Sequence, residues 1–112
     1  DELGGHIVTG HVDGVGRVES IASDGDSHRV AIRIGRTLAP FIAPKGSIAV
    51  DGVSLTVNAV EDDADGTIFH LNIIPHTWEV TTFAALAEGQ GVNIEIDTLA
   101  RYLQRMQAVM TR

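Results

Sequence analysis

The sequence predicts a small closed β-barrel of six antiparallel strands in a Greek-key-like order, with short connecting helices and a C-terminal amphipathic α-helix. Short runs of alternating apolar and polar residues dominate the chain, and a period of two is typical of antiparallel strands with one buried face. Turns rich in Gly and Asp separate these runs. About six short strands favour a closed barrel, because closure removes exposed strand edges.

The clearest strands have apolar side chains on one face. They are expected at Val30–Ile34, Val53–Ala59, Phe69–Ile73 and Val92–Ile96. In the second of these strands, Val57 and Ala59 are expected to share the apolar face. Two further strands are expected at Gly5–Val12 and Val15–Ile21, which brings the number to six.

The remaining elements are expected to be helical. Short connectors are expected at Thr37–Ile42 and Trp78–Ala87, and a longer helix at Thr98–Met110, where Asp97 occupies the N-cap position. The apolar side chains of this helix recur at steps of three and four: Leu99, Tyr102, Leu103, Met106, Val109 and Met110. This stripe either folds back on the barrel or packs against copies of itself. We expect a barrel domain over 1–97 and a helix over 98–112, whose stripe by itself is more typical of core packing than of an oligomer interface.

Composition narrows the function classes. A chain of 112 residues with 44% hydrophobic content fits one domain with a real core. The net charge of −7 disfavours nucleic acid as a partner, because a phosphate backbone would be repelled. The chain lacks Cys, a basic apolar leader and a long apolar run, so we expect a cytoplasmic protein. Its start at Asp1 instead of Met suggests a fragment or a processed chain.

Two histidines near the N-terminus are candidates for chemistry. His6 and His11 are five positions apart, so on a regular strand they point to opposite faces and are not expected to share a metal ion. One of them could serve a pocket, since His exchanges protons near neutral pH. On spacing alone, two partly exposed strand histidines are the favoured interpretation.

The stretch Lys45–Val57 holds the densest set of candidate ligand groups. Ser54 and Thr56 are two apart, so their hydroxyls share the face opposite Leu55. With Lys45 they could hydrogen-bond a heterocycle or a sugar chain, or they could simply face solvent. A second stretch, Ile74–Thr77, ends a strand at Pro75 and could expose backbone groups to a ligand.

Five runs together resemble the C-terminal half of riboflavin synthases, a lumazine-binding family. They are Gly4–Gly14, Lys45–Val57, Ile73–Thr77, Gly91–Asp97 and Arg101–Leu103. That family has two similar barrels in tandem followed by a helix that helps to assemble a homotrimer. The resemblance implies that this chain is the second barrel, a lumazine-binding domain over 1–97, with an oligomerisation helix over 98–112. It also implies that the first barrel is missing or lies upstream.

The resemblance also implies a reaction, in which one molecule of 6,7-dimethyl-8-ribityllumazine transfers a four-carbon unit to a second, giving riboflavin and a ribitylamino-pyrimidinedione. No cofactor or metal is needed, and the site forms between the first barrel of one subunit and the second barrel of a neighbour. His11, Asp97 and Thr56 are the implied catalytic residues, the first two for proton transfer or orientation of the nucleophile. The implied substrate-binding residues are His6, Gly10, Val12, Lys45, Ser54, Leu55, Ile74, Pro75, His76 and Thr77.

Two alternatives remain at this point. The chain could be a non-catalytic lumazine or flavin carrier with the same fold, although such carriers lose polar site residues that are present here. In isolation, it could also only self-associate, with a pocket too open for tight binding. Trp78 stands where the family often has Leu, and we expect this difference to affect packing only.

Overall fold

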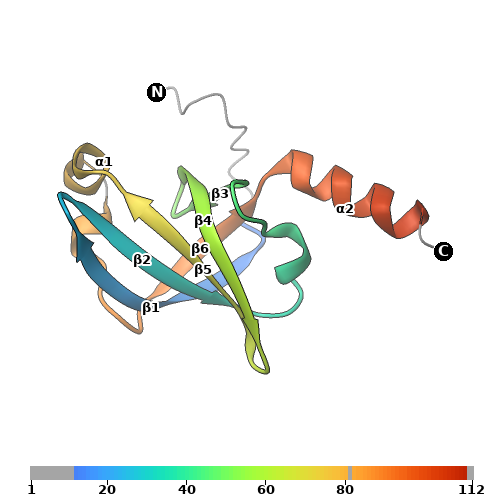
Figure 1. The fold of residues 1–112 in the computed structure, drawn as a ribbon, viewed down its shortest axis with the longest axis horizontal. Coiled ribbons are helices and arrows are strands. Elements are labelled where there is room, and N and C mark those ends of the chain that lie inside the picture. The colour runs from blue at the N-terminus through green and yellow to red at the C-terminus, as the bar shows by residue number, and fades with distance from the viewer. Residues whose placement is uncertain (1–11, 81, 111–112) are drawn as a thin grey trace.

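The computed structural model describes residues 12–80 and 82–110. Within this part of the chain, six strands form one closed antiparallel barrel, and a single long helix leaves it at the C-terminus (Figure 1). In chain order the elements are β1 (Gly14–Asp24), β2 (Ser27–Ile34), η1 (Ala39–Phe41), β3 (Ser47–Val50), β4 (Val53–Asp63), β5 (Gly66–Ile73), α1 (Pro75–Val80), η2 (Thr82–Ala85), β6 (Gly91–Ile96) and α2 (Thr98–Met110).

The strands are ordered β1-β2-β5-β4-β3-β6 around the barrel, and β6 closes it against β1. Strand β2 therefore pairs with β5, although two strands lie between them in the sequence. This is the Greek-key kind of order that was predicted. Each strand sends apolar side chains to the interior, and the most buried include Val18, Ile32, Ile48, Val57, Phe69 and Ile94.

One predicted strand does not correspond to a described one. The range Gly5–Val12 lies outside the described residues except for Val12, which has no regular secondary structure. The sixth strand is instead β3, which the sequence analysis did not separate from the stretch around it. Strand β3 is short, and Ile48, Ala49 and Val50 are all buried, so it lacks the alternation that marks a half-exposed strand.

The turn between β3 and β4 explains how this short strand is held. Asp51 and Gly52 have φ values of 48° and 83°, as a two-residue hairpin of the I′ type requires. The Asp51 carboxylate also accepts a hydrogen bond from the Asn93 N–H at 2.7 Å, which ties the turn to β6. The predicted Asp-Gly turn thus closes one hairpin and anchors a third strand.

A β-bulge in β4 corrects one predicted face. The register with β5 shifts between Val57 and Ala59, which are paired with Leu71 and His70. Val57 is buried as predicted, but Ala59 is exposed, and Val60 packs against the core in its place. The extra residue in the bulge reverses the alternation beyond it, and a reading by period alone does not reveal this.

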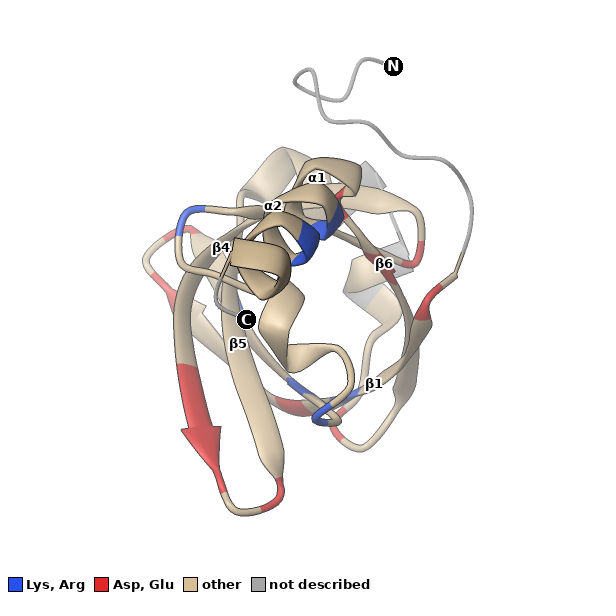
Figure 2. Cartoon of the chain, turned by 90° about the vertical axis from the view of Figure 1, so that its right-hand side faces the viewer, with Lys and Arg blue, Asp and Glu red and all other residues tan. Residues whose placement is uncertain are grey.

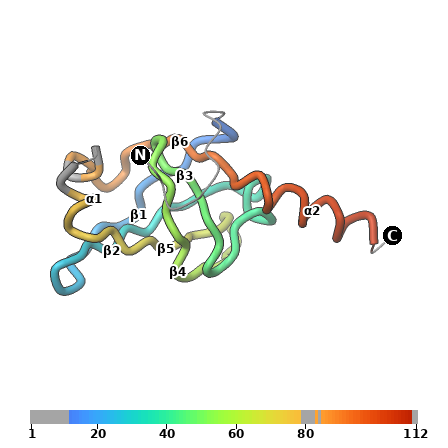
Figure 3. Tube along the Cα trace, turned by 90° about the horizontal axis from the view of Figure 1, so that it is seen from above, coloured from blue at the N-terminus to red at the C-terminus, as the bar shows by residue number. Residues whose placement is uncertain are grey.

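The predicted helical connectors are present but shorter. Thr37–Ile42 contains the 3-10 helix η1, and α1 and η2 overlap the predicted Trp78–Ala87. The helix α2 has the predicted bounds, Thr98–Met110. It projects from the barrel end next to η1, whereas α1 lies at the opposite end (Figures 1 and 3). In the described part of the chain, no helix combines the length and apolarity needed to cross a bilayer.

Candidate functional site

The two candidate hydroxyls lie on the outer surface of the barrel. Leu55 packs against the core on the inner side of β4, so Ser54 and Thr56 face outward, as their spacing predicted. Ser54 lies opposite Ala49 of β3, and Thr56 lies opposite Ser47. The Leu55 side chain packs against the core and is half-buried, so on the outer surface Leu55 offers a ligand its backbone.

Lys45 and Asp97 lie at the same end of this surface. The Lys45 N–H donates to the Val57 carbonyl at 2.7 Å, and this contact places the residue next to Thr56 along β4. Lys45 adopts a left-handed backbone conformation with φ of 68° and is exposed. Asp97 directly follows Ile96, which lies opposite Ile48 of β3. Thr56 and Asp97 thus lie on the same side of the barrel with Ser47 of β3 between them, and Lys45 lies beside Val57 of β4.

The stretch Ile74–Thr77 borders this surface on the other side. It continues from β5, whose register with β4 ends at Val57 opposite Leu71. Past that pair, β4 runs on beside β3, and the chain after β5 turns into α1 at Pro75. Ile74 and His76 are exposed, and Thr77 is half-buried. The stretches Lys45–Val57 and Ile74–Thr77 therefore lie on either side of the point where the pairing of β4 with β5 ends.

Several candidate residues lie outside this arrangement or outside the described residues. His6, Gly10 and His11 belong to residues 1–11, which the structure does not describe. Val12 is 56% exposed and directly precedes Asp13, whose N–H donates to the Ile94 carbonyl at 2.8 Å. The start of the described chain therefore reaches β6 close to Asp97. Among residues 12–80 and 82–110, no cluster of three or more His, Asp or Glu side chains could hold a metal ion.

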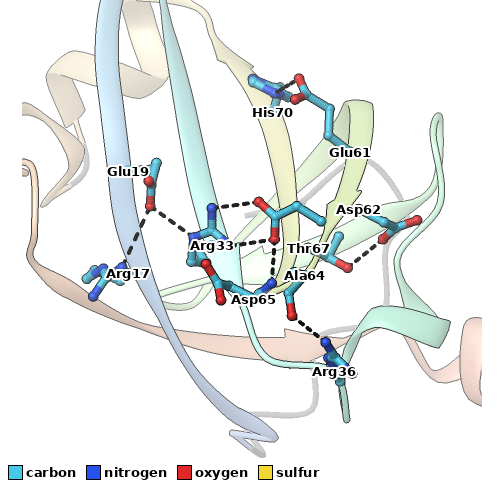
Figure 4. A network of polar contacts seen from close by, with 11 residues as sticks. Arg17, Glu19, Arg33, Arg36, Glu61, Asp62, Ala64, Asp65, Thr67 and His70 are labelled. Carbon is cyan, nitrogen blue, oxygen red and sulfur yellow. Dashed lines mark hydrogen bonds and ion pairs between the residues drawn. The ribbon is translucent and has the colours of Figure 1, made fainter.

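Sequence reasoning missed a hollow on the same outer surface. Its volume is about 250 Å³, and it is lined by Arg29, Asn58, Ala59, Glu61 and His70. Asn58 lies at the bulge, next along β4 from Thr56. His70 and Glu61 are in hydrogen-bond contact at 2.9 Å, as Figure 4 shows. No spacing rule could find this hollow, because the bulge that shapes it has no simple sequence pattern.

The strongest charge pairing lies away from the candidate site. Arg33 donates to both carboxylate oxygens of Asp63, at 3.0 and 2.9 Å, and to Glu19 at 3.3 Å (Figure 4). The hydrogen bonds from Arg33 lower the pKa of Asp63 to about 2. The same contacts raise the pKa of Arg33 above its usual range. Acidic residues gather at the end of β4, as Figure 2 shows. The pairing of Arg33 with Asp63 therefore stabilises the tip of the hairpin formed by β4 and β5.

Comparison with known proteins gives a consistent picture. The family model described as lumazine binding domain matches residues 9–97. The chain is 49% identical over 106 residues to a riboflavin synthase of Brucella abortus, a match that covers 95% of this chain and 50% of that protein. The chain spans about half the length of the curated relatives it matches.

Solved structures agree with the sequence matches. The chain superposes on crystal structures of LumP with a TM-score of 0.75, over 86% of its residues. One of these structures holds 6,7-dimethyl-8-(1'-D-ribityl) lumazine, and the sequence identity is 28% over 52% of that chain. The other holds riboflavin, with 29% identity over 50% of that chain. The likeness therefore extends to proteins that carry a lumazine or a flavin.

Proposed function

The chain belongs to the lumazine binding domain family, and from this premise we propose that it is the C-terminal barrel half of a riboflavin synthase. The observation that carries the proposal is the shared outward surface of β4, β3 and β6, where Lys45, Ser54, Thr56 and Asp97 gather. The identity of 49% to a riboflavin synthase supports the same assignment.

The proposed ligand is 6,7-dimethyl-8-ribityllumazine, and its product riboflavin would bind the same surface. Lys45, Ser54 and Thr56 offer an ammonium group and two hydroxyls, which suit the carbonyls of the ring and the hydroxyls of the ribityl chain. Ile74, Pro75, His76 and Thr77 would border the ring, with the backbone of Gly10, Leu55 and Val12 beside it. The exposed apolar side chain of Ile74 provides a contact for a flat heterocycle.

In the proposed reaction the protein aligns two lumazines and moves protons. The C7 methyl group of the substrate is itself acidic, so alignment and proton transfer supply most of the catalysis. His11 and Asp97 are the proposed proton-transfer groups, with Thr56 across Ser47 from Asp97 and His6 at the edge. A complete site would need the N-terminal barrel of a neighbouring subunit, and the chain alone would bind lumazine weakly without full activity.

The first experiment mixes the chain with 6,7-dimethyl-8-ribityllumazine and follows lumazine fluorescence and riboflavin formation together. We expect a saturable fluorescence change with little or no riboflavin, and activity once an N-terminal barrel is added. A flat titration would contradict the proposed ligand. Rapid riboflavin formation by the chain alone would show that copies of this barrel can pair into a working site, against the proposed need for a second kind of barrel.

The pocket assignment has its own test. Lys45 is the only lysine of the chain, so Lys45→Ala removes a unique ammonium group. We expect it to raise the Kd for the lumazine roughly 10-fold, and Ser54→Ala to raise it roughly 2- to 10-fold, as the loss of one hydrogen bond each predicts. Arg17→Ala and Ser23→Ala, both on exposed β1 positions, are matched controls. Equal Kd values for all four variants would remove Lys45 and Ser54 from the site.

A second candidate function is a carrier that binds lumazine or flavin without catalysis. The specific observation in its favour is the superposition on LumP complexes with both kinds of ligand. The two functions differ in one outcome. A carrier would bind the lumazine and form no riboflavin even after an N-terminal barrel is supplied.

A further inference from the structure

Asp13 connects three segments that are distant in the sequence. Its N–H donates to the Ile94 carbonyl at 2.8 Å, and its Oδ2 accepts from the Ile96 N–H at 2.7 Å. Its other carboxylate oxygen, Oδ1, pairs with the guanidinium of Arg101. The Asp13 side chain is only 17% exposed, so the bulk solvent screens these contacts less than those of a fully exposed pair. Asp13 thus joins the start of β1 to the end of β6 and to α2.

Arg101 extends this connection to a fourth segment. Its guanidinium carbon lies 5.5 Å from the centre of the Phe41 ring in η1, a distance typical of a cation–π contact. Its backbone N–H donates to the Asp97 carbonyl at 3.3 Å, so the same residue forms the first turn of α2. Within the described part of the chain, α2 has no buried residue. The contacts at its first turn are therefore what joins it to the barrel.

Asp97 lies between Ile96, whose N–H is bound by Asp13, and the first turn of α2, which carries Arg101. Asp13 fixes the N–H of Ile96, immediately before Asp97, and the Arg101 side chain ties the first turn of α2, which follows Asp97, to Asp13. Val12, the first described residue, directly precedes Asp13 and is anchored through the same residue. We infer that Asp13 and Arg101 are positioning residues of the ligand site, which hold Asp97 and Val12 in place. This inference rests on the proposed function.

The pair is expected to act as one unit. Without the Asp13 carboxylate, the Arg101 charge loses its partner, and α2 loses a contact at the turn that carries Asp97. Without Arg101, the carboxylate still caps Ile96 but no longer holds α2. Each single change should therefore loosen the same short stretch, and the second change should add little to the first.

The test uses the whole chain and titrates 6,7-dimethyl-8-ribityllumazine at a temperature where circular dichroism shows every variant folded. We expect Asp13→Asn and Arg101→Ala each to raise the Kd roughly 5- to 30-fold, and the double variant to raise it little further. Arg101→Lys keeps the charge and should restore binding to within about 3-fold. Asp63→Asn breaks the exposed pair with Arg33 at the far hairpin and is the matched control, with unchanged Kd.

The outcomes distinguish a failure of the proposed function from a failure of the positioning role alone. If the unchanged chain binds no lumazine, the proposed function and this role are both wrong. If the chain binds but Asp13→Asn and Arg101→Ala bind equally well, only the positioning role is wrong. Independent, additive effects, or a loss in Asp63→Asn as large as in the pair, would also overturn it. If Asp13→Asn does not fold, Arg101→Ala and Arg101→Lys decide the matter, because Arg101 lies outside the core.

Discussion

At the scale of single residues, the ion pair of Arg33 with Asp63 leads to a prediction about how the stability of the fold depends on pH. The hydrogen bonds from Arg33 lower the pKa of Asp63 from its ordinary 3.8 to about 2. A carboxyl whose pKa is lower in the folded state stabilises the fold above its unfolded pKa, and this contribution is lost as the pH falls through the folded value. The pair should therefore matter above about pH 4 and cease to matter near pH 2.

We expect Asp63→Asn to lower Tm at pH 6 and to have a shrinking effect between about pH 4 and pH 2. Thermal unfolding at several pH values measures this difference. Asp26→Asn, in the exposed turn after β1, is the control and should behave like the unchanged chain. A Tm difference that stays constant down to pH 2 would show that Asp63 is not held by Arg33.

The stack of His28 on Trp78 gives the packing role expected of Trp78 a specific partner. The two rings lie 3.8 Å apart with an angle of 8°, so Trp78 fastens α1 to β2 through one specific contact. Within the described residues, the buried Nδ1 of His28 has no hydrogen-bond partner. The position of His28 is therefore explained by the stacking of its ring on Trp78 and not by a hydrogen bond of its Nδ1.

This contact predicts opposite results for two substitutions of His28. His28→Ala should lower the free energy of unfolding by about 1 kcal/mol, and His28→Phe should keep or raise it, because Phe stacks and leaves no unsatisfied nitrogen. Trp78 is the only tryptophan, so its emission reports the contact directly. A red shift is expected for His28→Ala alone. Equal emission and stability in both variants would argue against the stack.

At the scale of elements, the physical features of each helix or strand explain whether the sequence could predict it. The helix α2 was predicted with its true bounds, because its apolar period changes sharply at Asp97 and no other element contributes to that pattern. Strand β3 was missed because both of its faces are covered. The bulge at Asn58 was missed because register is set by the partner strand, and one sequence cannot show it.

The hairpin of β4 and β5 requires a glycine at position 66. Its φ is 140°, and a Cβ there would overlap the Ile34 carbonyl oxygen. We expect Gly66→Ala to cost on the order of 3 kcal/mol, measured by urea unfolding. Gly25 has φ of 63° with open space around it, so Gly25→Ala should cost only roughly 1 kcal/mol. Similar costs at both glycines would show that neither the φ of 140° nor the close approach of Ile34 adds to the cost at Gly66.

At the scale of the whole molecule, the site was only partly predictable. Pairs two apart, such as Ser54 and Thr56, share a face by strand geometry alone, and the structure keeps them together. The approach of Asp97 and Lys45 to that pair depends on barrel closure through β3 and β6, which no local pattern encodes. The resemblance to a known family supplied these positions, and the residues 1–11 with His6 and His11 still rest on it alone.

The apolar stripe of α2 leads to a prediction about assembly. Leu99, Tyr102, Leu103, Met106, Val109 and Met110 are 46–79% exposed, and the helix projects away from the barrel (Figure 1). A stripe of this kind on an unburied helix favours packing against other copies of the chain, in line with the proposed oligomerisation role. We expect the chain to sediment above the 11.9 kDa of a monomer, and truncation after Asp97 to reduce its mass.

Truncation also removes Arg101, so point variants give the sharper test of the stripe. Leu103→Glu with Met106→Glu places two charges on the stripe and should give a monomer. Gln104→Glu with Ala108→Glu adds the same charge on the opposite side of α2 and should leave the mass unchanged. Because α2 buries no residue, the barrel should keep its Tm in both variants. Equal sedimentation of the two double variants would mean that the stripe does not hold copies together, whereas a loss confined to the first variant would make assembly and barrel folding separable properties of this chain.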